Sequence, residues 1–298
     1  MHRRFATLDV FTDTAFTGNP LAIVLEADGL DTPFMQIIAR EFNLSETVFV
    51  LRPADPSARA SLRIFTPARE LPFAGHPTIG TAVALNLIDG GDERAFVLEE
   101  QVGPVPCRAR STGAARGHAI FDLPRVPVNV GGSPERADVA RALGVAARDV
   151  APDDLPIQTW SAGNPFTFVP VRGLDAIASC AIDLSRFEQV LGGQGPGAAF
   201  VFCRETRHGG SSYHARMFAP AFGILEDPAT GAAVAAFAGY LAASGHYADG
   251  SHVVRVEQGH EMGRPSLLEL TMQLRGGTLA RASIAGDAIV VSEGTIDA

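Results

Sequence analysis

The chain has 298 residues, a length that suits two domains of ordinary size or one large domain. Hydrophobic residues make up 46% of it and charged residues 19%, so we expect a packed core and not a disordered chain. The net charge is -9 and there is no dense run of Lys or Arg, which argues against a nucleic-acid partner.

The N-terminus and the apolar segments predict neither export nor a membrane span. The first residues, MHRR, lead directly into an alternating strand pattern and not into the apolar run of a signal peptide. The longest segment without Asp, Glu, Lys, Arg or His is 228–245, which is shorter than a spanning helix and only mildly apolar. The three cysteines are odd in number and distant from one another, as is usual in a reducing compartment. We therefore expect a cytoplasmic protein without membrane contact.

The predicted elements alternate between strands and a few helices. In the first half, strands are expected at 4–10, 20–25, 46–51, 60–65, 95–101, 105–110 and 117–122, and helices at 32–42 and 77–88. In the second half, strands are expected at 166–171, 198–203, 212–218, 252–257, 266–273, 278–283 and 287–293, and helices at 135–144, 184–192 and 229–244.

The two halves repeat one pattern. The segment RIFTPA, which begins at Arg63, recurs as RMFAPA at Arg216, and three further segments recur in the same order. A junction rich in Pro and Gly, PRVPVNVGG, covers 124–132. We therefore predict a first lobe over 1–128, with 284–298 as a candidate addition, and a second lobe over 129–283.

Each lobe combines many strands with one strongly apolar helix. The helix at 229–244 carries small residues on every face, which is typical of full enclosure. We therefore expect an α+β fold of two pseudo-symmetric lobes, each a barrel-like sheet around a central helix.

In each half, a turn rich in Gly and Pro leads into the buried helix: 72–80 in the first, 226–231 in the second. Helix N-termini present N–H groups that can bind a carboxylate or an oxyanion. Two such turns from paired repeats would face each other across a cleft that binds a small molecule. Two structural alternatives stay open: Asp227 as a plain N-cap with Pro228 as the first helical residue, and His76 as a structural histidine.

Glu46 breaks the internal symmetry. It begins the apolar strand segment TVFV, and the equivalent position of the second half is Ala198. An acid found in only one repeat suggests a role in one half. From the residues alone, a structural role remains equally open.

Several motifs together resemble those of the PhzF-like phenazine biosynthesis family. The resemblance runs nearly from end to end and rests on Phe16-Thr-Gly18-Asn19-Pro20, Asn43-Leu-Ser45-Glu46-Thr47, the run from Arg63 to Pro77, Glu226-Asp227-Pro228-Ala229-Thr230-Gly231, and Gln258-Gly259 with Met262-Gly263-Arg264-Pro265. It implies the fold of diaminopimelate epimerase, a homodimer, and a reaction without metal or organic cofactor. The namesake reaction of that family is the isomerisation of trans-2,3-dihydro-3-hydroxyanthranilic acid.

The resemblance also implies roles for individual residues. Glu46 would be the general acid/base that moves a proton within a small unsaturated cyclic amino or hydroxy acid, and such a dual role needs a pKa near the working pH. His76 and Asp227 would flank this small carboxylate substrate, while N–H groups of Gly75 and of the Gly231 turn would bind its carboxylate. The remaining residues of the implied binding site are Asn19, Pro77, Thr230 and Ala232.

Ala232 departs from the family pattern, which often has a Ser that contacts the substrate. Loss of that hydroxyl would alter specificity. Two other functions stay open: a binding protein that keeps the fold without catalysis, and an amino-acid racemase or epimerase. The racemase chemistry needs a thiol in each turn, whereas the cysteines lie elsewhere, at Cys107, Cys180 and Cys203.

The remaining signals favour structural interpretations. Gln258-Gly259-His260 through Pro265 is either a loop that closes over the substrate or a turn between strands, and the turn is favoured; Trp160 is interpreted as a core or rim residue. We expect no metal site, because His208, His214 and His246 lack the spacing of metal ligands and are interpreted as solvated surface residues.

Overall fold

The computed structural model describes residues 2–152, 155–193 and 195–298. The chain divides into two compact units. Unit 1 comprises Met1–Pro124 and Ser283–Ala298, and unit 2 comprises Arg125–Ala282. The boundaries predicted from sequence, 128/129 and 283/284, lie within a few residues of these.

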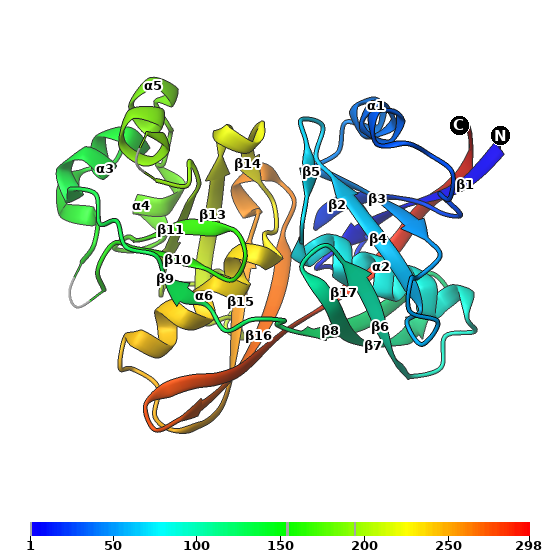
Figure 1. The fold of residues 1–298 in the computed structure, drawn as a ribbon. Helices are drawn as coiled ribbons and strands as arrows, with labels where there is room; N and C mark the ends of the chain where they lie inside the picture. The colour runs from blue at the N-terminus through cyan, green and yellow to red at the C-terminus, as the bar shows by residue number, and fades with distance from the viewer. Residues whose placement is uncertain (1, 153–154, 194) are drawn as a thin grey trace. The chain divides into compact units, whose positions relative to one another are not determined.

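Unit 1 is a closed barrel (Figure 1). Its strands pair around a ring in the order β1, β2, β3, β4, β6, β7, β8 and β17, and β17 pairs again with β1. The short β5 (Glu70–Leu71) pairs with β4 beside this ring. The strand bounds are β1 His2–Val10, β2 Asn19–Val24, β3 Glu46–Leu51, β4 Ala60–Phe65, β6 Arg94–Glu100, β7 Gly103–Gly113, β8 Arg116–Asp122 and β17 Thr278–Asp297.

The helix α2 (Gly75–Ile88) occupies the interior of this barrel and contacts β1, β2, β3, β6, β7 and β8. Every residue from Gly75 to Asn86 is buried, as expected for a helix that is apolar all round. Gly80 allows the close approach, because a Cβ there would lie 2.5 Å from Cδ2 of Leu21. The other helix, α1 (Thr32–Phe42), is capped by Asp31 and covers β3 and β4.

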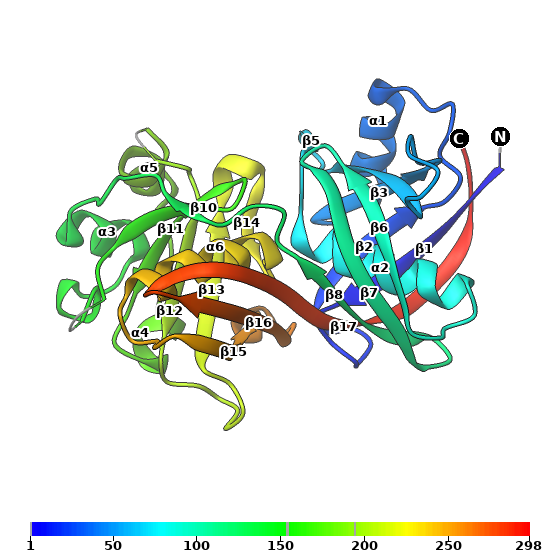
Figure 2. The ribbon, with the colours of Figure 1, turned by 60° about the horizontal axis from the view of Figure 1, so that its bottom comes forward.

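Unit 2 wraps a curved sheet around α6 (Gly231–Ala243), which contacts β9, β10, β11 and β16 (Figure 2). Its strands are β9 Val128–Asn129, β10 Gln158–Ser161, β11 Pro165–Pro170, β12 Ala199–Cys203, β13 Tyr213–Ala219, β14 Ile224–Asp227, β15 Gly250–Gln258 and β16 Ser266–Arg275. A second apolar cluster lies under short peripheral helices. These are α3 Arg136–Leu143, η1 Ala147–Asp149, α4 Leu174–Ala178, α5 Leu184–Phe187 and the π-helical turn η2 Glu188–Gly192.

The repeat expected from the sequence is visible in the topology. The parallel pairs β2/β3 and β4/β6 of unit 1 correspond to β11/β12 and β13/β15 of unit 2. An ion pair repeats as well: Arg63 on β4 binds both oxygens of Glu70, and Arg216 on β13 binds both oxygens of Glu226. The predicted architecture of two pseudo-symmetric lobes around central helices is confirmed.

The structure corrects several predicted bounds. β17 is one strand of 20 residues, whereas the sequence predicted two strands with a break near Gly286. This glycine is not a turn residue; it admits the Phe11 ring, which lies 2.4 Å from the position of its missing Cβ. The helix predicted from 229 begins at Gly231, and the helix predicted from 77 begins at Gly75.

Among the residues described, no helix combines the length and the apolar composition that a membrane span requires.

Replacing Gly239 of α6 with Ala is expected to destabilise unit 2 by about 1–3 kcal/mol, because the site is already filled. The new Cβ would lie 2.5 Å from the Trp160 ring and 2.8 Å from Cβ of Pro127. Urea unfolding followed by the fluorescence of Trp160, the only tryptophan, measures the change. Gly209→Ala is the control, since no heavy atom lies within 4 Å of its added Cβ. Equal midpoints for Gly239→Ala and wild type would contradict this packing.

Candidate active site

Three polar side chains expected from the sequence come together inside unit 1. Asn19 begins β2, Glu46 begins the adjacent parallel strand β3, and His76 is the second residue of α2. Nδ1 of His76 lies 3.1 Å from Oε2 of Glu46 and 3.3 Å from Nδ2 of Asn19. All three residues are buried, so the cluster places a carboxyl group and an imidazole side by side away from bulk water.

The buried surroundings of His76 favour its neutral imidazole form at physiological pH. Burial lowers its pKa to about 3, although a hydrogen bond to the backbone of Pro20 acts in the opposite direction. Its Nε2 is buried and has no hydrogen-bond partner within the described residues. The Nε2 atom is therefore available to a ligand, as an acceptor or as a donor according to the tautomer of the ring.

The first turn of α2 has no side-chain cap. Its N-cap is Ala74, which cannot accept the hydrogen bonds that Asp31 accepts for α1. Pro77 has no N–H, so the amide groups offered at this end come from Gly75 and His76. Such an end of a buried helix favours a bound anion.

The buried acid Glu100 contacts the first turn of α2 through Thr78. The Thr78 hydroxyl lies 2.7 Å from the carbonyl oxygen of Ala74 and 2.7 Å from Oε1 of Glu100. The hydroxyl is the donor in both contacts, so its single proton is shared between the Ala74 carbonyl and the Glu100 carboxyl. Burial raises the pKa of Glu100 to about 8, although the hydrogen bond from Thr78 acts in the opposite direction. The raised pKa favours a neutral carboxylic acid next to the turn that bears His76.

The corresponding turn of unit 2 is held by an amide. Oδ2 of Asp227 accepts a hydrogen bond of 2.6 Å from the Thr230 hydroxyl. The buried Gln258 donates to the Asp227 carbonyl at 2.7 Å and accepts from the Thr230 N–H at 3.1 Å. The N-cap of α6 is Thr230, so the alternative that Asp227 caps the helix with Pro228 as first helical residue is wrong.

The first residues of α6 present a small surface. Gly231 is buried, while Ala232 is partly exposed and offers only a methyl group. The α6 end, like the α2 end, has no side-chain cap. Its backbone N–H groups are therefore the polar groups that this helix start can offer to a ligand.

The two repeats differ at the position of Glu46. The sequence match between the two turns aligns His76 with Asp227, so both units keep a polar residue there. Glu46, in contrast, corresponds to Ala198, which is fully buried and whose carbonyl accepts the N–H of Thr167. Unit 2 has no ionisable side chain at that position.

The predicted site residues thus fall into two sets, one in each unit. Unit 1 holds Asn19, Glu46, Gly75, His76 and Pro77, and unit 2 holds Asp227, Thr230, Gly231 and Ala232. The sequence interpretation missed two supporting residues. Gln258 was placed in a motif but interpreted as part of a turn, and Glu100 ends an apolar strand segment where a buried acid is unusual.

The thiols are not reactive groups. Cys107, Cys180 and Cys203 are all buried, and burial raises the pKa of Cys180 and of Cys203 to about 12. Burial also raises the pKa of Cys107 well above its usual value. These cysteines therefore do not favour racemisation by a thiol pair.

The histidine expectation was partly wrong. His208 and His246 are exposed as predicted, but His214 is fully buried between Glu257 and Glu261. The sequence pattern could not show this, because both carboxylates come from a segment more than 40 positions later.

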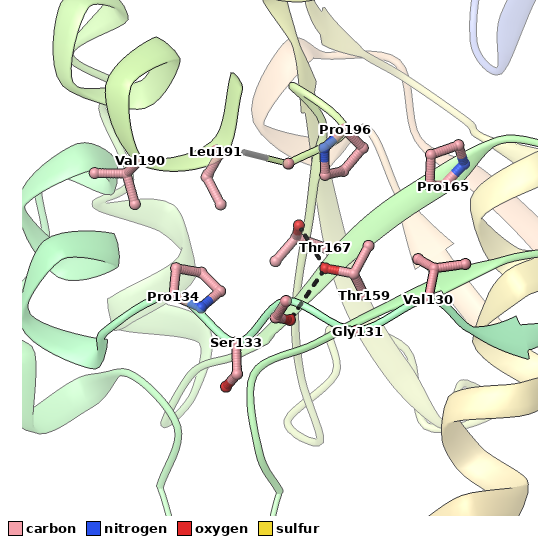
Figure 3. Close-up of a pocket in the computed structure, with 12 residues that line it drawn as sticks. Val130, Gly131, Ser133, Pro134, Thr159, Pro165, Thr167, Val190, Leu191 and Pro196 are labelled. Atoms are coloured by element: carbon pink, nitrogen blue, oxygen red, sulfur yellow. Dashed lines mark hydrogen bonds between the residues drawn. The ribbon is translucent and has the colours of Figure 1, made fainter. Parts of the chain in front are cut away.

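A separate cavity of about 340 Å³ lies in unit 2 beside β10 and β11 (Figure 3). The hydroxyl groups of Thr159 and Thr167 lie 3.2 Å apart in it. The described residues that line it carry no titratable side chain: they are Val130, Gly131, Gly132, Ser133, Pro134, Thr159, Pro165, Thr167, Val190, Leu191, Gly195 and Pro196. These residues therefore offer no acid–base group.

Comparison with known proteins gives one consistent result. Residues 8–294 match the family described as phenazine biosynthesis-like protein. The chain is 43% identical to an uncharacterized isomerase of Mesorhizobium japonicum, over 99% of this chain and 98% of the relative. It is 35% identical to a trans-2,3-dihydro-3-hydroxyanthranilate isomerase of Pseudomonas fluorescens, over 99% of both chains.

Solved structures agree. A phenazine biosynthesis protein of the PhzF family from Bacillus anthracis superposes with a TM-score of 0.88 at 28% identity, covering 100% of both chains. A hydroxyproline epimerase of Agrobacterium vitis superposes with a TM-score of 0.64 at 12% identity, covering 99% of this chain and 91% of that one. The second likeness shows a common fold.

Because burial raises the pKa of Glu100, we expect the free energy of unfolding to depend on pH. The folded chain keeps a proton that the unfolded chain releases near pH 4.5, so this stabilisation is complete below that pH and is lost as the pH rises to about 8. Glu100→Gln should flatten the fall in unfolding free energy over this window, which for one proton is at most about 1.4 kcal/mol per pH unit. Urea unfolding followed by circular dichroism at pH 5 and pH 8 measures it, with the exposed Glu93→Gln as control. An unchanged slope in Glu100→Gln would show that Glu100 is ionised in the fold.

Proposed function

Since this chain belongs to the phenazine biosynthesis-like family and is an isomerase, we propose that it moves a proton between two carbons of a small unsaturated cyclic amino or hydroxy acid, without a cofactor. The observation that carries the proposal is the buried Glu46, 3.1 Å from a neutral His76 and next to the uncapped start of α2. The proposed substrate class follows the name of the Pseudomonas fluorescens relative, trans-2,3-dihydro-3-hydroxyanthranilate isomerase.

Glu46 performs both proton transfers in this proposal. Its carboxylate takes a proton from an sp³ carbon, the C–H electron pair shifts into the conjugated system, and the same carboxyl group returns a proton at another carbon. Atoms and electrons balance without an oxidant or a reductant. A neutral His76 suits this cycle, because a cation there would hold Glu46 permanently as a carboxylate.

The groups around Glu46 supply binding and charge stabilisation. Nε2 of His76 accepts a hydrogen bond from the substrate amine or hydroxyl in the tautomer that leaves this nitrogen unprotonated. The N–H groups of Gly75 and His76 stabilise negative charge that develops on the substrate. Asn19, whose side chain lies beside the His76 ring, holds that ring in place.

The proposal keeps the substrate-binding roles that the sequence analysis expects in unit 2. The Asp227 carboxylate would bind an amine or hydroxyl, and the N–H groups at the start of α6 would bind a carboxylate. The rigid hydrogen bonds of Gln258 support this assignment, because a binding turn must be preorganised.

Glu46→Gln is expected to lower turnover of trans-2,3-dihydro-3-hydroxyanthranilic acid by at least about 100-fold, since general acid–base catalysis contributes about 10²–10⁴. An NMR time course in deuterated water measures both conversion and the entry of deuterium at carbon. The exposed Glu41→Gln on α1 is the matched control and should behave as wild type.

The outcomes separate the candidate functions. Conversion with deuterium incorporation by wild type and Glu41→Gln, but not by Glu46→Gln, supports the proposal. Unchanged turnover in Glu46→Gln would remove Glu46 from the mechanism. Tight binding of the substrate by wild type, with neither conversion nor deuterium entry, would favour a binding protein.

Ala232→Ser tests the departure at the start of α6. If the substrate presents a polar group there, the new hydroxyl adds one hydrogen bond, worth about 0.5–1.5 kcal/mol, and raises kcat/KM by up to about 10-fold. Steady-state kinetics with trans-2,3-dihydro-3-hydroxyanthranilic acid measures this change. Ala232→Gly, which adds no hydroxyl, is the control. A fall in kcat/KM in the Ser variant alone would show that this substrate presents no polar group at this position.

A further inference from the structure

A dense cluster of histidine and glutamate side chains lies in unit 2, outside the site described above. At its centre His214 donates from both ring nitrogens to carboxylates: Nδ1 lies 2.8 Å from Oε1 of Glu257 and Nε2 lies 3.1 Å from Oε1 of Glu261. His208 and His260 lie next to the hydrogen-bonded residues Glu257, His214 and Glu261. Their ring centroids lie 5.2 Å apart, and the His260 ring lies 5.4 Å from the His214 ring.

The two outer histidines differ from His214 in one respect. Within the parts of the chain that the structure describes, neither the His208 ring nor the His260 ring makes a hydrogen bond. One nitrogen of each ring and one carboxylate oxygen of Glu257 lie within 4.8 Å of one another. Two imidazoles with free nitrogens and one carboxylate are a common ligand set for Zn²⁺ and related transition metals.

We propose that His208, His260 and Glu257 bind a divalent transition-metal ion of the Zn²⁺ type in unit 2. Three protein ligands leave a fourth position for water. This inference departs from the sequence expectation, because the three ligands come from the loop after β12, from β15 and from the following turn η4 (His260–Met262). Only the fold brings them together.

The cluster combines a fixed ligand with movable ones. Glu257 is fully buried, accepts the backbone N–H of His208 at 3.1 Å and is paired with His214, so its carboxylate is preoriented. The His208 side chain is exposed, and His260 is partly exposed. Ligand atoms in a tetrahedral zinc site are about 3.3 Å apart for bonds of about 2.0 Å, so the two rings must close by a small rotation.

The residues next to the proposed ligands are already joined by hydrogen bonds. His214 connects the proposed ligand Glu257 to Glu261, and Glu261 also receives a 3.1 Å hydrogen bond from Nη2 of Arg207. Hydrogen-bonded partners of this kind orient metal ligands and are part of most metal sites. Arg207 directly precedes His208. The hydrogen bonds from Arg207 to Glu261 and from His214 to Glu261 and Glu257 therefore connect the chain next to His208 with Glu257.

The position suggests what a bound ion would do. Glu257 and His260 flank Gln258 and Gly259, and the Gln258 amide holds the turn from Asp227 to Thr230. An ion held on both sides of Gln258 would stabilise this turn. The inference is independent of the proposed reaction, because it concerns binding and stability and not the proton transfer at Glu46.

The test uses the full, untagged chain freed of metal by chelator dialysis and titrated with Zn²⁺ against a chromophoric chelator. Wild type should bind one Zn²⁺ per chain, and His208→Gln and His260→Gln should each weaken binding by at least about 10-fold. His246→Gln, an exposed histidine outside the cluster, is the control and should match wild type. Zn²⁺ should also raise the unfolding temperature of wild type and not of the two variants.

Two results would overturn the proposal. One is the absence of stoichiometric Zn²⁺ binding by wild type; the other is wild-type affinity in both His208→Gln and His260→Gln. Circular dichroism checks that the variants fold. Co²⁺ bound to wild type provides a readout without any variant: intense visible absorption of a four-coordinate ion supports the site, and the weak spectrum of hydrated Co²⁺ contradicts it.

Discussion

The contact between a neutral imidazole and a buried carboxyl group is the constraint on which the rest of this structure depends. Burial lowers the pKa of His76 to about 3, so the ring beside Glu46 is uncharged. The Glu46 carboxyl therefore faces an uncharged ring, which is the condition on which the proposed proton transfer depends. Its surroundings of apolar strand and helix also exclude the water that would compete for that proton.

The barrel of unit 1 encloses the helix α2, and the first turn of this helix bears His76 of the candidate site. The α2 backbone can approach β2 because Gly80 has no side chain to meet Leu21. In its first turn the Thr78 hydroxyl lies 2.7 Å from the Ala74 carbonyl oxygen and 2.7 Å from Oε1 of the buried Glu100. Packing and proton chemistry are thus connected, since the same buried elements that hold the barrel together place His76 against Glu46.

Much of the fold and part of the candidate site could be predicted from the sequence, because the signals for them lie within short segments. Strand alternation, two apolar helices and the repeated Arg-x-Phe motifs gave the lobes, and the symmetry break between Glu46 and Ala198 pointed to the acid. The remainder depends on contacts between distant segments. The sequence near Gly286 does not indicate that this residue contacts the Phe11 ring, and the sequence near Gln258 does not indicate its hydrogen bond to Asp227. The sequence around His214 is typical of a surface residue, because its partner Glu257 comes from the distant strand β15.

The most direct test of the account is the protonation state of His76, followed by NMR of the chain labelled with ¹⁵N-histidine and assigned with His76→Gln. The account predicts that the ring stays neutral from pH 8 down to at least pH 5, with one protonated nitrogen and one bare nitrogen, because its pKa is lowered to about 3. A titration of His76 near pH 6.5 would contradict it. Glu46 would then face a largely protonated ring below about pH 6, and the contact with a neutral imidazole described above would not exist there.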